Sequence, residues 1–86
     1  MEHKIISYFE GYPIYLSNRK NKKYMAFVNN RFVHFGDKRY EQYKDKIGYY
    51  KYLDHNDMNR KKLYYIRHPK NYPKGSPDWL SKQILW

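Results

Sequence analysis

Apolar positions in the first third of the chain fall into short runs rich in β-branched and aromatic residues. Residues 4–9 and 12–17 are two such runs, and Glu10-Gly11 lies between them. This arrangement predicts a hairpin over about 4–17. Pro13 lacks a backbone N–H group, so it needs a position at a sheet edge or at the start of a strand.

The clearest local pattern is a second pair of runs, residues 23–28 and 31–35, separated by Asn29-Asn30. Asparagine tolerates positive φ, so two asparagines suit the type I′ turn of a two-residue hairpin. The register then pairs Val28 with Arg31, Phe27 with Phe32, Ala26 with Val33, and Met25 with His34. Because cross-strand partners share a face, Met25, Phe27, Phe32 and His34 lie together, opposite Tyr24, Ala26, Val33 and Phe35. Both faces are largely apolar, so we expect the hairpin at the centre of the core.

In the second half of the chain, apolar residues recur at the spacing of an α-helix. A longer helix is predicted over about 57–68, with Asp54 and Asn56 as candidate N-caps and Pro69 just beyond its end. Its apolar stripe is narrow and its remaining surface is basic. We therefore expect this helix to rest on the sheet with one side and to present cations with the other.

Two shorter helices are also expected. One covers Tyr40 to Lys46 and is broken by Gly48. The other covers about 77–85, where Ser76 is the N-cap and proline occupies the first helical position. We expect this last helix to dock its tryptophans on the core.

Length and composition fit one α+β domain over residues 1–86. It consists of a small antiparallel sheet of three to four strands packed by the basic helix and the C-terminal helix. The chain has no cysteine, which excludes disulfides and thiolate metal sites. No apolar run is long enough for a membrane helix or a signal peptide. An intracellular protein that is not secreted and does not bind membranes is expected.

The charge is strongly basic, with 18 Lys and Arg against 8 Asp and Glu and a net charge of +10. It is concentrated in two blocks, because residues 19–39 and residues 58–75 each sum to +6 while the segment between them sums to −1. The 12 tyrosines argue for a folded core rather than disorder. Lysines can merely keep a small protein soluble. Two such blocks favour a polyanionic partner, and phosphates suit them if the fold brings the blocks to one side.

The nucleic-acid-binding hypothesis depends on cations that neutralise phosphates and on a tyrosine that stacks on unpaired bases, although core packing is the alternative role for each tyrosine. The candidate residues are Arg19, Lys20, Lys22, Lys23, Arg31, Lys38, Arg39, Arg60, Lys61, Lys62, Tyr64, Arg67 and Lys70. No sequence specificity and no cofactor are implied.

The histidines suggest one alternative function, that of a metal-dependent nuclease. Asp54-His55-Asn56-Asp57 is superficially similar to the histidine–asparagine pairs of small metal-dependent nucleases, with His68 as a further candidate ligand. On one continuous helix, His55 and His68 would be about 20 Å apart and could not share a metal. We therefore interpret this segment as the capped start of a helix, and His34 as a hydrogen-bonded histidine that is either in the core or half-buried. No catalytic or metal-binding residue is predicted.

An ordered set of motifs resembles a family of small uncharacterised basic proteins of nucleocytoplasmic large DNA viruses. The resemblance covers residues 23–86. The motifs are Val28-Asn29-Asn30-Arg31, Val33 through Glu41, Asp54 through Asp57, Arg60-Lys61, Tyr65 through His68, Trp79-Leu80-Ser81 and Ile84-Leu85-Trp86. The family carries no established activity, so the resemblance implies no catalytic residue. It implies a viral origin, with virion packaging or assembly as the setting.

The leading hypothesis is a non-catalytic viral accessory protein that binds the phosphate backbone of DNA or RNA without strong sequence specificity. It would act in the host cytoplasm or nucleus, or in the virion. A minor structural protein that binds acidic protein surfaces, such as those of viral capsid protein, is the alternative. A metal-dependent nuclease comes third. The sequence leaves the oligomeric state open.

Overall fold

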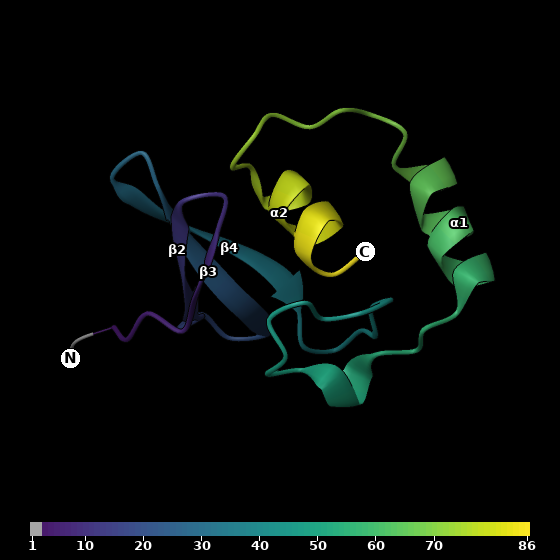
Figure 1. The fold of residues 1–86 in the computed structure, drawn as a ribbon, viewed down its shortest axis with the longest axis horizontal. Coiled ribbons are helices and arrows are strands. Elements are labelled where there is room, and N and C mark those ends of the chain that lie inside the picture. The colour runs from purple at the N-terminus through teal and green to yellow at the C-terminus, as the bar shows by residue number, and fades with distance from the viewer. Residues whose placement is uncertain (1–2) are drawn as a thin grey trace.

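The computed structural model describes residues 3–86; Met1 and Glu2, which belong to the expected domain 1–86, lie outside the described residues. Strands β1 (Ser7–Phe9), β2 (Tyr12–Leu16), β3 (Lys22–Val28) and β4 (Arg31–Asp37) form one four-stranded antiparallel sheet in chain order. A short 3-10 turn, η1 (Lys51–Leu53), precedes the helices α1 (Met58–Arg67) and α2 (Pro77–Ile84). Figure 1 shows α2 against the sheet and α1 at the far end of the molecule. The α+β class is confirmed.

Both hairpin turns have positive φ at their two central residues. Glu10 and Gly11 have φ values of 46° and 85°, and Asn29 and Asn30 have φ values of 49° and 65°. Positive φ at both central positions is the requirement of a type I′ turn. The predicted register of the second hairpin is confirmed at all four pairs, from Val28 opposite Arg31 to Met25 opposite His34. Pro13 lies at the start of β2, before the residues that pair with β3.

Strand alternation divides the sheet into an inner face and an outer face. The inner face supplies most of the core, which contains Ile14, Tyr24, Ala26, Val28 and Phe35, and α2 covers it with Leu80, Ile84 and Leu85. Ser76 caps α2 by accepting a hydrogen bond from the Trp79 amide at 3.2 Å. The Trp79 ring packs edge-on against Phe9 and Tyr12. The expected docking of the C-terminal helix is therefore observed.

The outer face differs from the prediction that both faces of the second hairpin are core. Met25 is buried there, but Phe27 and Phe32 are each 37% exposed. No helix covers this face in the described part of the chain, because α2 lies on the inner side and α1 approaches no strand. Two aromatic rings are consequently left partly in contact with solvent.

The segment between β4 and α1 is irregular, so the helix predicted over Tyr40 to Lys46 is wrong. Its amides have partners far away in the sequence: Lys44 N donates to Leu85 O at 3.0 Å, and Lys46 N donates to Ile84 O at 3.1 Å. These bonds satisfy carbonyls at the C-terminal end of α2, which have no partner within the helix. Tertiary hydrogen bonds here replace the local helical ones.

A buried hydrogen-bond network fixes this segment to β3. The Tyr24 hydroxyl donates to the Asp45 carboxylate and accepts a bond from Tyr49 N at 3.1 Å. The same carboxylate accepts bonds from the amides of Ile47 and Tyr50 at 2.9 and 2.8 Å. Burial and the Asp45 hydrogen bond raise the pKa of Tyr24 above its usual value, so the hydroxyl remains a donor. Asp45 thus links β3 to the irregular residues 45–50.

Helix α1 does not rest on the sheet, which corrects the predicted packing. All ten of its residues are described, and none of them is buried. Its N-cap is Asp57, rather than Asp54 or Asn56, and the Asp57 carboxylate accepts bonds from the amides of Asn59 and Arg60. The inner face of the sheet is already occupied by α2 together with Ile47 and Tyr50. No apolar surface of the sheet therefore remains there for α1.

Replacing Tyr24 with phenylalanine tests the network. Tyr24→Phe removes the donor to Asp45 and the acceptor for Tyr49 N while preserving the ring, so we expect the free energy of unfolding to fall by about 1–3 kcal/mol. Urea denaturation at neutral pH measures the change. Tyr52→Phe is the matched control, because Tyr52 is 76% exposed and such surface changes stay within about 0.5 kcal/mol. Equal stability of the two variants would contradict the role of the network.

Candidate nucleic-acid interface

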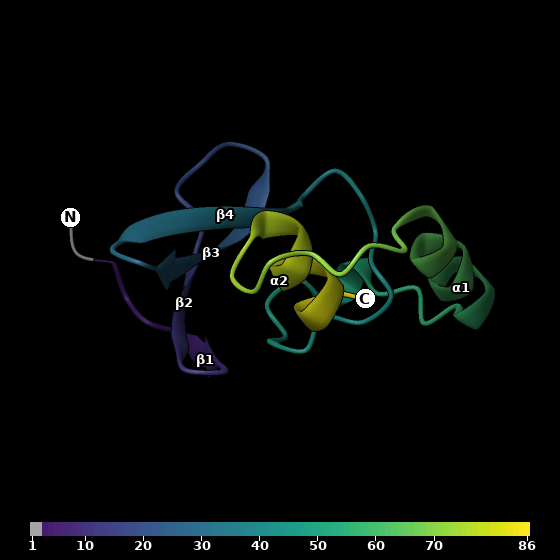
Figure 2. The same ribbon diagram turned by 90° about the horizontal axis from the view of Figure 1, so that it is seen from above.

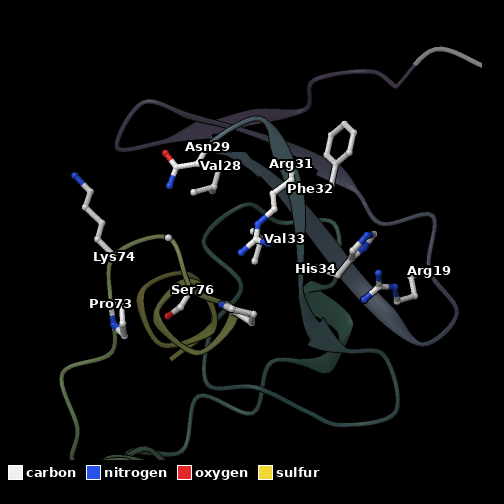
Figure 3. Close-up of a pocket in the computed structure, with 12 residues that line it drawn as sticks. Arg19, Val28, Asn29, Arg31, Phe32, Val33, His34, Pro73, Lys74 and Ser76 are labelled. Carbon is white, nitrogen blue, oxygen red and sulfur yellow. The ribbon is translucent and has the colours of Figure 1, made fainter.

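An open groove lies between β4 and the segment that leads into α2. Its volume is about 680 Å³, and Figure 3 shows the residues around it. Residues 31–34 of β4 form one wall, and residues 73–77 form the other. Ligand sites commonly have volumes of about 300–1,000 Å³. The groove is therefore large enough for a phosphate with its attached sugar.

Three cations from three separate segments line this groove: Arg19, Arg31 and Lys74. Arg19 comes from the loop between β2 and β3, Arg31 begins β4, and Lys74 precedes α2. Among residues 3–86, neither arginine makes an ion pair, and Lys74 has only the exposed Glu10 at 3.7 Å. Both basic blocks of the sequence thus contribute to one site.

His34 lies beside Arg19 at the edge of the groove (Figure 3). It is half-buried, and its Nδ1 lies 2.7 Å from Ser17 Oγ, as the sequence interpretation expected. Ser17 Oγ also accepts a bond from Arg19 N at 3.0 Å, so it joins the His34 ring to the Arg19 backbone. Burial, followed by the charges of Arg19 and Lys22, lowers the pKa of His34. The neutral imidazole therefore helps to hold the Arg19 loop against β4.

The cations of α1 lie elsewhere. The molecule extends over 40 Å along its longest axis, and Figures 1 and 2 both place α1 at the opposite end from the β3–β4 turn. Arg60 pairs with Glu41 at 2.9 Å, and the Lys61 ammonium lies 4.4 Å from the centre of the Tyr43 ring. Lys62, Arg67 and Lys70 are exposed. The two basic blocks share a site only through Lys74, and α1 forms a second, separate basic surface.

Lys23 is removed from the candidate set, because its side chain is only 2% exposed. Its ammonium donates to Tyr40 O at 3.0 Å and to Gln42 Oε1. Burial lowers the pKa of Lys23, although Asp45, Asp37 and Asp54 act in the opposite direction. Lys23 therefore belongs to the buried network rather than to a phosphate-binding surface.

Tyr64 also does not have a freely exposed ring. It stacks on Trp86 with ring centres 4.3 Å apart and planes 1° apart, and His68 lies 4.5 Å away. Burial raises the pKa of Tyr64 to about 12. Core packing was the alternative role that the sequence allowed for Tyr64, and packing is what the structure shows. The ring attaches α1 to the C-terminal Trp86.

The remaining candidates of the first block surround β3 and β4. Lys20, Lys38 and Arg39 are exposed, and Lys22 is half-buried opposite Asp37. Arg39 binds both carboxylate oxygens of Asp37, at 3.0 and 2.7 Å, and lowers the pKa of that carboxyl to about 2. These side chains do not line the groove.

The histidine–asparagine segment behaves as a turn into α1. His55 Nδ1 accepts a bond from Asp57 N at 3.0 Å. His55 and His68 are not on one helix; Trp86 and Tyr64 stack between them. Within the described residues, no group of three His, Asp or Glu side chains is placed to hold a metal ion.

Sequence reasoning missed two residues of the site. Lys74 was counted in the second basic block but not among the binding residues, since nothing local marks it as lining a groove with Arg31. Phe32 was assigned to the core. The only signal for Lys74 in the sequence was its position just before Gly75, Ser76 and Pro77, where α2 begins. The partial exposure of Phe32 depends on the absence of a helix on the outer face of the sheet among the described residues, and the sequence does not show this.

Comparison with known proteins gives one match. A family of unknown function (DUF5754) matches residues 12–45, less than half of the chain, and this segment contains β2, β3, β4 and Asp45. The match overlaps the expected resemblance over residues 23–45 only, and the family's description gives neither a function nor a viral origin. No curated protein and no solved structure matches the chain. Among the helices of residues 3–86, none is long and apolar enough to cross a membrane.

The lowered histidine pKa values give a prediction for stability. Burial lowers the pKa of both His34 and His55 in the folded protein. Unfolding returns these imidazoles to about 6.5, so the unfolded state binds more protons and stability falls as pH decreases through about 6.5.

Two measurements test this effect. In NMR titrations we expect the imidazoles of His34 and His55 to have midpoints below about 6.5, and we expect lower urea stability at pH about 5.5 than at neutral pH. The double variant His34→Gln, His55→Gln should show a weaker dependence over this range. The Asp37 carboxyl, with a pKa of about 2, does not titrate there. Midpoints above 6.5 for both histidines would contradict the assignment.

Proposed function

We propose that this protein is a small, non-catalytic nucleic-acid-binding protein that holds phosphates of DNA or RNA in the groove beside β4. The observation that carries the proposal is that Arg19, Arg31 and Lys74 all line that groove. These side chains come from segments far apart in the sequence, so their common position is a property of the fold rather than of a local run of charge.

The electrostatics support a phosphate partner. The chain has a net charge of +10, which attracts polyanions over distances longer than a contact. Lysine and arginine side chains that neutralise phosphates release condensed counterions, and this release drives binding. Phosphate contacts carry no sequence information by themselves. We therefore propose binding without strong sequence specificity.

The biological setting is proposed from the resemblance over residues 23–86 to small basic proteins of large DNA viruses. A viral accessory protein in the host cytoplasm, the nucleus or the virion would encounter long nucleic acids. This setting is compatible with the groove, but it does not choose between DNA and RNA.

A salt series with a charge-removal variant tests the groove. The variant is Arg19→Gln, Arg31→Gln, Lys74→Gln, in which each changed side chain is exposed. If three phosphate contacts are lost, the slope of log affinity against log salt should become shallower by about 2–3. Fluorescence anisotropy with labelled duplex and single-stranded DNA of unrelated sequence measures the slope.

The matched control removes the same charge from the other end of the molecule. Lys62→Gln, Arg67→Gln, Lys70→Gln changes three exposed cations of α1 and the residues after it. We expect a smaller change of slope for this variant, because only long-range attraction is weakened. No binding by the wild type at low salt, a salt-independent affinity, or equal slope changes in the two variants would contradict the proposal.

A second candidate function is supported by the exposed face of α1. Leu63 and Ile66 are 53% and 70% exposed, and Lys62 and Arg67 flank them in the sequence. This combination complements an acidic protein surface with an apolar stripe. The alternative of a minor structural protein, bound for example to capsid protein, would use this face rather than the groove.

A synthetic amphipathic peptide tests this second candidate. Its helix would carry a leucine stripe bordered by glutamates. Because each buried aliphatic side chain contributes about 1.5–3 kcal/mol, Leu63→Gln, Ile66→Gln should weaken binding by at least about tenfold. Binding should also persist at high salt, measured by calorimetry. Peptide binding that disappears with salt, or is unchanged in the variant, would exclude the candidate.

A further inference from the structure

The outer face of the sheet carries a connected cluster of aromatic rings, defined here as the outer aromatic cluster: Tyr15, Phe27 and Phe32. The rings of Tyr15 and Phe32 are 5.3 Å apart at 85°, and those of Phe27 and Phe32 are 5.2 Å apart at 60°. The three residues come from β2, β3 and β4. Because Phe27 and Phe32 are each 37% exposed, the cluster presents partly open rings.

A planar nitrogen heterocycle already lies on this cluster. The imidazole of His3 packs edge-on against Phe32 and Tyr15, with ring centres 5.2 and 6.2 Å apart. His3 is itself exposed and precedes the first strand. The rings of this face therefore make edge-on contacts with a flat heteroaromatic ring from a segment outside the sheet.

Phe32 connects the aromatic cluster to the cationic groove. It belongs to the outer aromatic cluster and also lines the groove with Arg19 and Arg31. Figure 3 shows the neighbouring side chains of Arg31 and Phe32 pointing to opposite sides of β4, as strand alternation requires. The aromatic rings thus lie on one face of the sheet, and the groove that Phe32 borders is lined by Arg19 and Arg31, neither of which forms an ion pair among residues 3–86.

We propose that the preferred ligand is a single-stranded nucleic acid, with unpaired bases stacked on the outer aromatic cluster and phosphates bound by Arg19 and Arg31. This inference rests on the proposed function and specifies its substrate class. Every base has a π-face, so stacking on aromatic side chains tolerates any sequence. In a duplex the faces of the bases are covered by their neighbours, so the cluster offers a duplex no comparable contact.

A second copy of the chain is the other possible occupant of this face. Charge disfavours that occupant, because each copy carries a net charge of +10. A nucleic acid supplies both the flat rings and the negative charge that the two sides of β4 complement. The observations therefore favour the single strand.

The first experiment compares three ligands with the wild-type protein at one low salt concentration. They are a single strand of mixed sequence, the same strand with its bases removed at abasic sites, and the corresponding duplex. We expect the intact single strand to bind at least about tenfold more tightly than the abasic strand, because even one stacked base contributes about that factor. We also expect it to bind more tightly than the duplex.

The second experiment removes the rings but keeps the apolar character. Phe27→Leu, Phe32→Leu should abolish the advantage of the intact strand over the abasic strand. Tyr40→Leu, Tyr52→Leu is the matched control, since these rings are 66% and 76% exposed and lie outside the cluster. Circular dichroism would check that both variants fold. The comparison of the three ligands with the wild-type protein does not depend on either variant.

The outcomes separate this inference from the proposed function. Equal affinity for intact and abasic strands, with the salt slope still dependent on Arg19, Arg31 and Lys74, would overturn single-strand stacking and leave phosphate binding in place. Duplex binding as tight as single-strand binding would overturn it in the same way. No binding of any ligand would overturn both. A wild-type dimer in sedimentation that Phe27→Leu, Phe32→Leu dissociates would assign the face to a second copy.

Discussion

The buried side chains of Lys23 and Tyr24 hold together the parts of this molecule that have no regular secondary structure. These neighbours in β3 bind Gln42 and Asp45, and Gln42 in turn donates to Asp54 Oδ1 at 2.6 Å. The segment fixed in this way bonds through Lys44 N and Lys46 N to the last carbonyls of α2. Because an unsatisfied buried polar group is costly, the members of the network support one another. The network therefore connects two adjacent residues of β3, through residues 42–46, to the C-terminal end of α2.

Features determined by neighbouring residues were predictable from the sequence. The turn at Asn29-Asn30 set the strand register, and Ser76 with Pro77 marked the start of α2, because turn and cap chemistry act over a few residues. The segment from Tyr40 to Lys46 was not predictable, since its amides bond to the end of α2. Lys23 stands beside Lys22 in a basic run and has the sequence signature of a surface lysine; its burial depends on Gln42, nineteen positions later.

The same distinction applies to the candidate site. Counting charge along the chain identified both basic blocks but could not determine which members meet in space. Folding divides the blocks by location: Arg19 and Arg31 join Lys74 at the groove, while the cations of α1 lie at the other end of the molecule. Tyr64 was predicted to stack on bases because cations surround it in the sequence, but its ring packs against Trp86 within the protein. The partly exposed rings are instead those of Phe27 and Phe32, which sequence reasoning assigned to the core.

The weak attachment of α1 has a consequence for local unfolding of the molecule. The helix has no buried residue and is held by one ring stack and a few exposed polar contacts. Elements with so little buried area open at a small fraction of the free energy of global unfolding. The amides of α1 will therefore exchange with solvent by local unfolding, long before those of β3. A protease that cleaves after lysine will cut transiently opened α1 while the sheet and groove remain folded.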